Sequence, residues 1–234
     1  MRGVWLIWGM AACGFPKLPQ LGDDVGPRDA DHDTASDTPG GFAPIHLDPT
    51  MLLTGAPDLV LSGGTTTIDT TAHTINGATN AFFVQQGPYA VLFTNAFAVQ
   101  TPTNVTGTNP LIVVATDRIS LTANLSSLAN FATPGAGARI GGPGMGGAGA
   151  SFLGAGDRES SGGAGGSYGS LGGPGGTSDP NMIPPGGTGV RYGMLPTDPL
   201  AGGSSGGPGG FASGTVGLPG AGGGAIQLSS AMSI

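Results

Sequence analysis

Glycine recurs at every third position through a long part of this chain, and this spacing restricts what that part can fold into. Of the 48 glycines, 35 lie between Gly135 and Gly224. The longest runs with a spacing of three are Gly163, Gly166, Gly169, Gly172 and Gly175, and then Gly214, Gly217, Gly220 and Gly223. A period of three fits neither an α-helix nor a β-strand. It matches the polyproline II helix, which has three residues per turn and rises about 3.1 Å per residue.

We therefore predict that residues 131–224 form an insertion of polyproline II-type helices packed side by side. Such helices make no internal hydrogen bonds, so their N–H and C=O groups must pair with neighbouring helices. Glycine at every third position lets the neighbours approach. Gly169 is predicted to be an inward position that tolerates no Cβ, whereas Ser170 should tolerate replacement. The apolar side chains of the loops should be buried at the ends of the helices: Phe152, Leu153, Met182, Ile183, Met194 and Leu195. Disorder of the whole region is the alternative.

Residues 1–12 have the pattern of a bacterial export signal. Arg2 supplies a minimal positive region, and the apolar run from Gly3 to Ala12 follows it. This run is well short of the roughly 20 residues that a membrane-spanning helix needs. The pattern therefore predicts a signal peptide.

Cys13, the single cysteine, follows the small residues at the end of this signal. Met10-Ala11-Ala12-Cys13 resembles the lipobox of bacterial lipoproteins. The resemblance implies cleavage before Cys13, acylation of that residue, and membrane attachment through the acyl chains. Gly14 follows the cysteine instead of the Asp that is typical of inner-membrane retention, so the expected location is the outer membrane or cell surface. An ordinary secreted protein with an incidental buried cysteine is the alternative.

The charge of the chain disfavours nucleic acid as a partner. Without the signal, six basic residues stand against 14 acidic ones, a formal charge near −8. Such an acidic chain repels phosphate backbones. Lysine and glutamate occur once each, as Lys17 and Glu159. With so few strong helix formers and so much glycine, threonine, asparagine and proline, helix content should be very low.

Residues 13–44 are predicted to be an acidic, disordered tether. Six aspartates lie between Asp23 and Asp37, with few apolar residues among them. This composition cannot bury enough surface to offset chain entropy. The stretch Asp29–Asp33 resembles the start of a calcium loop, but Thr34 and Gly40 stand where such a loop needs Gly and Glu. A charged tether is therefore favoured over a calcium site.

Residues 45–130 predict short β-strands separated by turns. The expected strands are rich in β-branched and aromatic residues and are bounded by Gly, Pro or Asn. They are 59–61, 65–68, 81–84, 90–93, 97–99, 111–115 and 118–121. The continuously apolar run Leu111–Ala115 predicts a strand buried on both faces. The chain has no 3.6-residue pattern long enough for a helix, so we expect an all-β fold.

An internal match relates the two ends of the predicted insertion. The apolar positions Leu111, Val113 and Ile119 recur 115 residues later as Ile226, Leu228 and Ile234. Equivalent residues one above the other are typical of a β-solenoid. We predict a short parallel β-solenoid (β-helix-like) in which residues 225–234 return as a strand beside Leu111–Ala115. A generic β-sandwich is the alternative.

Catalytic motifs are weak in this glycine background. Gly202–Gly206 matches GxSxG, but the last histidine, His73, precedes it, so the order of a hydrolase triad fails. Gly142–Gly147 matches GxGxxG without a preceding strand or a following helix. The three histidines share no spacing with each other or with Cys13, so no zinc site is indicated. The sequence therefore predicts no catalytic, cofactor-binding or metal-binding residues.

A family resemblance rests on PLIVVATDRISLTANLSS, GPGMGGAGASFLGAG, YGMLPTDPLAGGSSGGPGG and GGGAIQLSSAMSI. From about Thr65 to the end, the chain resembles predicted glycine-rich lipoproteins of bacterial surfaces, which pair a β-helix-like segment with a glycine-rich insertion. The resemblance implies a non-enzymatic structural or adhesive surface protein. Members of that family continue with further coils, so this chain is expected to be a shortened form.

Two further expectations concern binding. An open strand edge after Ala225 should favour self-association. The alternative function is a carbohydrate-binding or carbohydrate-cleaving β-helix. An exposed row of Asp, Asn and Tyr along the coils would favour it, and Asp117 with Arg118 is the nearest candidate for a catalytic pair.

Overall fold

The computed structural model describes residues 42–139, 141–142, 144–153, 158–178, 183–193, 200–211 and 216–234. These residues belong to one compact unit that begins at Phe42. The only helical element among them is a 3-10 turn, η1 (Pro49–Met51), and the regular elements are otherwise strands. The prediction of an all-β fold is confirmed.

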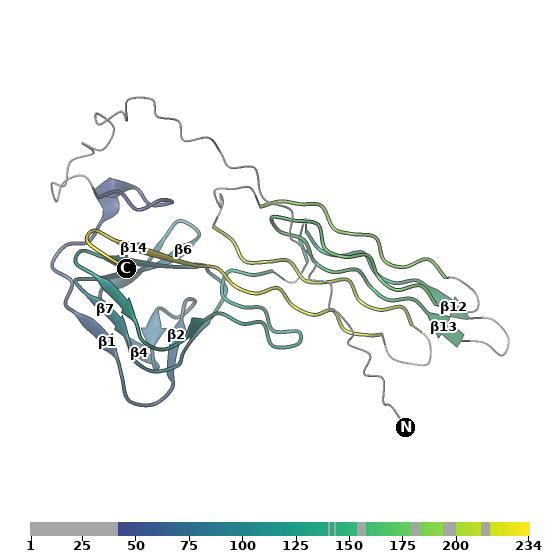
Figure 1. The fold of residues 1–234 in the computed structure, drawn as a ribbon, viewed down its shortest axis with the longest axis horizontal. Coiled ribbons are helices and arrows are strands. Elements are labelled where there is room, and N and C mark those ends of the chain that lie inside the picture. Colours follow the sequence, from purple (N-terminus) through teal and green to yellow (C-terminus); the bar gives the residue numbers. More distant parts are fainter. Residues whose placement is uncertain are drawn as a thin grey trace, which may run out of the picture. The chain divides into compact units, whose positions relative to one another are not determined.

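Nine strands form three groups of parallel neighbours, and the chain visits the groups in a fixed cyclic order (Figure 1). The first group is β1 (Leu59–Leu61), β7 (Phe97–Val99) and β10 (Ile119–Leu121). The second is β2 (Thr66–Asp69), β8 (Thr103–Thr106) and β11 (Leu125–Ser126). The third is β6 (Tyr89–Thr94), β9 (Leu111–Ala115) and β14 (Ile226–Ser230). Equivalent residues of β7 and β10, such as Phe97 and Ile119, pair directly.

Antiparallel strands extend the second and third sheets, each on the side of its first parallel strand. β3 (Thr74–Ile75) and β4 (Ala78–Thr79) follow β2, and β5 (Phe83–Gln86) pairs with β6. A separate hairpin of β12 (Ser151–Leu153) and β13 (Arg158–Ser160) lies within the glycine-rich region.

The main core lies between the three parallel groups. It contains alternate residues of each strand, because successive side chains of a strand point to opposite faces. Its fully buried members include Ile68, Leu92, Phe97, Val99, Leu111 and Val113. All five residues of β9 are buried, so the prediction of a strand covered on both faces is confirmed.

The outer face of the third sheet is covered by a segment that we call the N-terminal strap, residues 42–56. Phe42, Leu47, Leu52 and Ala56 pack against a cluster of buried outer side chains: Val91, Phe93, Ile112 and Val114. The last residues of the predicted tether, 42–44, therefore belong to the described unit.

Gln227 of β14 fastens the strap to the sheet. Its Nε2 donates to the carbonyl of Ile45 at 2.8 Å, and its Oε1 lies 2.6 Å from Nδ1 of His46. Because an amide oxygen only accepts, Nδ1 is the donor of this pair. The strap thus joins the first described residues to the last described strand.

The predicted return of the chain beside β9 is confirmed in register. Ile226 pairs with Leu111 and Leu228 with Val113 in a parallel ladder. The offset of 115 residues continues past the strand, because Arg118 pairs with Ser233 in an isolated bridge. The N–H of Ile119 donates to the Ser233 carbonyl at 2.9 Å.

Between β11 and β14 the described residues form extended segments whose backbones bond mainly to neighbouring segments (Figure 1). Local bonds occur at turns, such as that from the Ala138 N–H to the Gly135 carbonyl. The N–H groups of Gly203, Gly206 and Gly209 donate to the carbonyls of Gly223, Gly220 and Gly217 at 2.8–3.0 Å. Likewise Ser161, Ala164 and Ser167 donate to Ala150, Gly147 and Gly144. Bonded residues recur at every third position in both pairs of segments. The predicted backbone pairing between neighbouring segments is therefore present.

Close approach of backbones explains many of the inward glycines. A Cβ at Gly163 would collide with the Gly207 carbonyl, and one at Gly166 with the Ser204 carbonyl. Gly172 and Gly175 are equally crowded by the carbonyls of Gly165 and Gly162. Four of the five glycines in the longest run therefore face a neighbouring backbone.

The prediction for Gly169 is wrong. A Cβ built there meets nothing within 4 Å. The bend at residues 168–170 explains this, because the chain there turns from one segment to the next and leaves the packed region. The glycine spacing of three residues therefore continues through Gly169, although the backbone there does not pack against a neighbouring segment.

Candidate functional site

The predicted lipid-attachment residue, Cys13, lies outside the described residues, as do the signal at 1–12 and the aspartates 29–33. Acylation of Cys13 stays a prediction. No helix within the described ranges is long and apolar enough to cross a membrane.

The serine motif at Gly202–Gly206 does not form a nucleophile site. Ser204 is 7 % exposed and its Oγ has no hydrogen-bond partner among the described residues, while the Oγ of Ser205 accepts the N–H of Gly141 at 3.0 Å. His73 instead bonds Gln85 through Nε2 at 2.9 Å and stacks edge-on against Phe83. Ser205 and His73 are therefore engaged in contacts that support the fold, and they do not form a nucleophile–base pair.

The glycine motif at 142–147 is part of the packed backbone. A Cβ at Gly144 would meet Tyr192, and one at Gly146 would meet the Ala164 carbonyl. The N–H of Gly146 already donates to the carbonyl of Ser205 at 3.2 Å. A phosphate would have to displace these contacts, so the motif does not form a nucleotide site.

A row of polar residues follows the corner that connects the third sheet to the first. Asn95 lies between Asp58 and Thr116: its Nδ2 donates to Asp58 at 2.7 Å, and its Oδ1 accepts the Thr116 hydroxyl at 3.1 Å. Asp117 continues the row, since its N–H bonds the Asn95 carbonyl. The row joins successive strands to each other, and the side chains of Asp58, Asn95 and Thr116 bond to one another in doing so.

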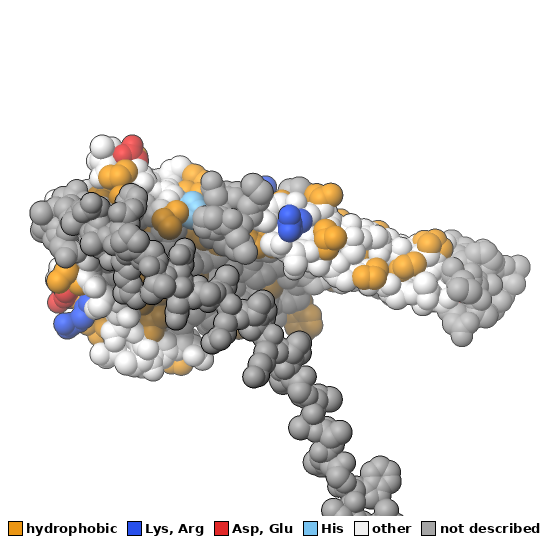
Figure 2. Space-filling view, turned by 45° about the horizontal axis from the view of Figure 1, so that its top comes forward, with side chains coloured by type: hydrophobic (Ala, Val, Ile, Leu, Met, Phe, Trp, Pro, Cys, Tyr) orange, Lys and Arg blue, Asp and Glu red, His pale blue; other side chains and the backbone are white. Residues whose placement is uncertain are grey.

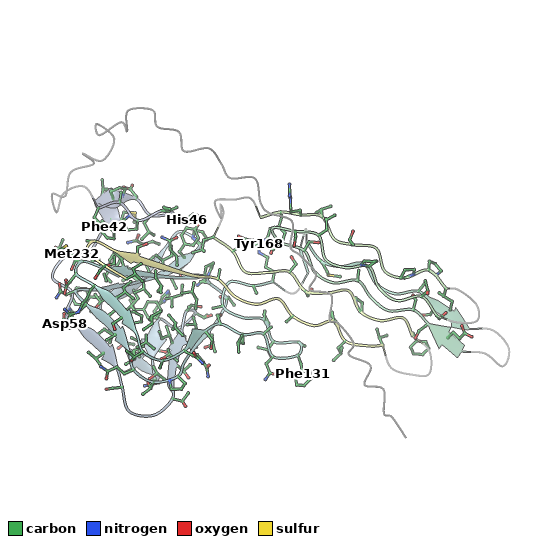
Figure 3. All side chains as sticks on the ribbon, viewed as in Figure 1. Phe42, His46, Asp58, Phe131, Tyr168 and Met232 are labelled. Atoms are coloured by element: carbon green, nitrogen blue, oxygen red, sulfur yellow. The ribbon has the colours of Figure 1, made fainter. Side chains whose placement is uncertain are left out.

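The glycine-rich region has few charges and several exposed apolar side chains. Its charged residues within the described ranges are Arg139, Arg158, Glu159 and Arg191. Figure 2 shows apolar side chains spaced along it between white stretches of backbone and other side chains, and Leu171 and Val190 are each 62 % exposed. Phe131, at a turn near its base, is 90 % exposed and points outward in Figure 3.

A shallow cavity of about 150 Å³ lies between the strap and the turn that joins β5 to β6. We call it the strap cavity; its lining residues are His46, Leu47, Asp48, Met51, Gln86, Gly87, Pro88 and Tyr89. The Nε2 of Gln86 donates to the Met51 carbonyl at 2.8 Å, which links the two walls. Gln86 is 8 % exposed, and no described residue bonds its Oε1.

Asp48 carries the negative charge of the strap cavity. The Thr50 hydroxyl and then the Thr50 N–H donate to its Oδ1, at 2.7 and 2.9 Å, and hold the pKa of this carboxyl below its ordinary value. Asp48 is therefore ionised at neutral pH.

Sequence reasoning missed the strap cavity because its two walls come from segments about 40 residues apart. No motif links Asp48 to Gln86, and only the packing of the strap on the third sheet brings them together. Within the described part of the chain, no group of three or more His, Cys, Asp or Glu side chains could hold a metal ion.

Comparisons with known proteins found no relative. A scan of family models and searches of curated proteins and of solved structures gave no match.

Proposed function

We propose that this chain is a non-enzymatic, lipid-anchored protein of the bacterial outer membrane or cell surface, with a structural or adhesive role. In this proposal a short parallel β-solenoid forms the base. A slab of polyproline II-type glycine helices, inserted between β11 and β14, is the part displayed. The observation that carries the proposal is the parallel pairing of β14 with β9 on either side of the insertion.

The solenoid is supported by the order in which the chain visits its strands. The sequence of the three groups repeats from β1 and β2 to β6, then from β7 and β8 to β9, and then from β10 and β11 to β14. Residues one repeat apart pair in parallel, as Ala90 does with Leu111. Stacked repeats of this kind bury a continuous core that a single repeat could not bury alone.

A structural role for the slab is supported by its chemistry. It is held by backbone hydrogen bonds, with added bonds from buried serines such as Ser161, whose hydroxyl donates to the Pro184 carbonyl at 2.7 Å. Few of its side chains could act as acids, bases or nucleophiles. A rigid, weakly charged surface suits adhesion or spacing better than catalysis.

The anchor is tested by Cys13→Ser in the full-length chain expressed in a bacterium that processes lipoproteins. We expect the wild type in the membrane fraction with acyl chains in its intact mass, and the variant in the soluble fraction without acyl chains. Unchanged membrane association of the variant, or a wild-type mass without acyl groups, would contradict lipid anchoring.

The alternative is a carbohydrate-binding or carbohydrate-cleaving β-helix, and the row of Asp58, Asn95 and Asp117 is the observation that favours it. Glycan binding that is lost in Asp117→Asn would support this alternative. The existing bonds of Asn95 with Asp58 and Thr116 favour the structural role.

Self-association at the outer edge of β14 is also part of the proposal. β14 is the outermost strand of its sheet in the described part of the chain, and such edges pair readily with further strands. Sedimentation velocity over a range of protein concentrations tests this: a monomer at all concentrations would contradict it.

A further inference from the structure

The last repeat of the parallel strands presents an open edge. Within the described ranges, β10, β11 and β14 are each the outermost strand of their group, and we call this side of the sheets the open end. The Ala225 carbonyl and the Ala231 N–H both bond to β9. Because the backbone groups of successive residues point to opposite sides of a strand, those of Ile226, Leu228 and Ser230 point away from β9. These three residues form the open edge of β14.

The open end also leaves the main core partly uncovered. Val113 is fully buried, whereas Leu228, which pairs with it one strand further out, is only partly buried. Leu121 is 44 % exposed although it pairs with the fully buried Val99. Met232, which Figure 3 labels close to β14, is 75 % exposed. A further layer of apolar side chains would remove this surface from water, which is favourable.

The open end is uncharged, although the chain is acidic. Residues 119–128 and 225–234 contain no Asp, Glu, Lys or Arg, whereas the whole chain has a formal net charge of −7. Edge strands are commonly protected from pairing by lysine or proline, and β14 contains neither. Two copies of this end can therefore meet without like-charge repulsion, while a charged partner would find no opposite charge here.

The opposite end of the sheets is closed to the same kind of contact. The outer edge of β2 is occupied by β3, and that of β6 is occupied by β5. A head-to-tail stack, in which the last repeat of one copy pairs with the first repeat of the next, therefore lacks two of the three edges that it needs. Contact between two open ends has no such obstacle, and it closes at two copies related by a two-fold axis.

We propose that the open end binds the open end of a second copy, with β14 antiparallel to β14 of that copy about a two-fold axis at Leu228. Ile226 then lies opposite Ser230 of the second copy, and the outward N–H and C=O groups of the two strands pair. The partly buried apolar side chains of both copies form one continuous core. This inference rests on the proposed self-association and adds the partner strand and the symmetry.

The glycine-rich regions do not obstruct this dimer. Segment 216–225 leads directly into β14 at its first residue (Figure 1). Because the two-fold axis reverses β14, the corresponding segment of the second copy enters its strand from the opposite side. The two glycine-rich regions therefore extend in opposite directions.

Sedimentation velocity on two lysine variants tests the contact. All proteins are the full chain carrying Cys13→Ser, so that neither acylation nor a disulfide at this residue contributes. Leu121→Lys places a lysine in the contact and should weaken dimerisation about tenfold or more, because each dimer would bury two charges. Val60→Lys is the matched control, since Val60 is 51 % exposed on β1, at the opposite end of the same sheet. It should dimerise like the parent protein.

Hydrogen exchange of the parent protein at low and high concentration gives a second readout that needs no substitution at the contact. The amides of Ile226, Leu228 and Ser230 should exchange more slowly at the high concentration. The amides of Gly203 and Gly209, which bond within one copy, should not change.

The outcomes separate this contact from the broader proposal. A monomer at all concentrations would overturn the proposed self-association together with this contact. A species larger than a dimer, equal weakening in the two lysine variants, or a dimer without added protection in β14 would overturn this contact alone. Protection of the β14 amides in a monomer would mean that another segment of the same chain covers the edge, and would also overturn it. Anchoring at Cys13 is tested independently.

Discussion

The parallel-sheet region and the glycine-rich region are held together by opposite means. In the sheets, large side chains such as Phe97, Leu111 and Ile112 are fully buried and supply the stability. In the glycine-rich region the backbones themselves approach each other, and a Cβ at many positions would strike a carbonyl. Glycine loses more conformational freedom on folding than any other residue, so this packing requires many hydrogen bonds per residue. The comparison shows that one chain can pack in two ways: by burying large side chains in one region, and by bringing glycine backbones together in another.

The largest effect on stability should come from removing a large side chain from the core of the parallel sheets. Phe97→Ala removes a fully buried ring and should lower the free energy of unfolding by about 3–5 kcal/mol. Equilibrium denaturation followed by circular dichroism measures the loss. A change below about 1 kcal/mol would show that the sheet region does not depend on this core.

The next largest effect should come from adding a side chain to the glycine-rich region. Gly166→Val places a Cβ against the Ser204 carbonyl, and overpacking of this kind costs about 1–3 kcal/mol or more. Gly169→Val is the matched control, because it makes the same change three residues away where nothing lies within 4 Å. Limited proteolysis should cut Gly166→Val within residues 144–224 much faster than the control. Equal cleavage rates in the two variants would favour disorder of this region.

The glycine spacing of three residues and the return strand could be predicted from the sequence. Which glycines of each run face a neighbouring backbone could not. The spacing of Leu111 and Val113 recurs at Ile226 and Leu228, and a shared apolar pattern identifies strands that pair. In the segment 201–210, however, Gly203 and Gly209 donate to residues 217–223, and Gly207 and Gly210 donate to Ala164 and Ser161 of another neighbour. A Cβ has room at Gly203 and Gly209 but not at Gly207 and Gly210. Because six of the ten residues there are glycine, few side chains mark which face is inward.

The short strands and the strap were also hard to predict, for a different reason. β8 (Thr103–Thr106) consists of polar Thr-Asn-Val-Thr, and two threonines of the core, Thr66 and Thr103, are buried in place of apolar residues. The strap has no strand pattern, since it covers the sheet with scattered side chains such as Phe42 and Leu47. Both depend on tertiary contacts that local patterns do not encode.

A smaller effect should follow from releasing the strap. Gln227→Leu removes the bonds to Ile45 and His46 and should cost about 1–2 kcal/mol, with faster amide exchange in residues 45–56. The exchange rates of the glycine-rich amides should stay the same. Faster exchange throughout both regions would mean that they do not open separately.

The smallest effect should be the pH dependence of stability that Asp48 contributes in the strap. The Thr50 bonds lower the pKa of Asp48 in the folded state. Their contribution is therefore complete above the unfolded pKa of about 4 and is lost as pH falls through the lowered folded value. Asp48→Asn should remove this part of the acid titration of stability. An identical pH profile in the variant and the wild type would contradict the assignment.

Residue-resolved hydrogen exchange of the glycine-rich amides tests the central claim most directly. The account predicts protection of Gly203, Gly206 and Gly209, which donate to carbonyls 2.8–3.0 Å away in residues 217–223. Gly162 and Gly165 should be protected in the same way by Gly176 and Gly173. Exchange of all five amides at the rate of an unstructured peptide would contradict the hydrogen-bonded packing of these segments.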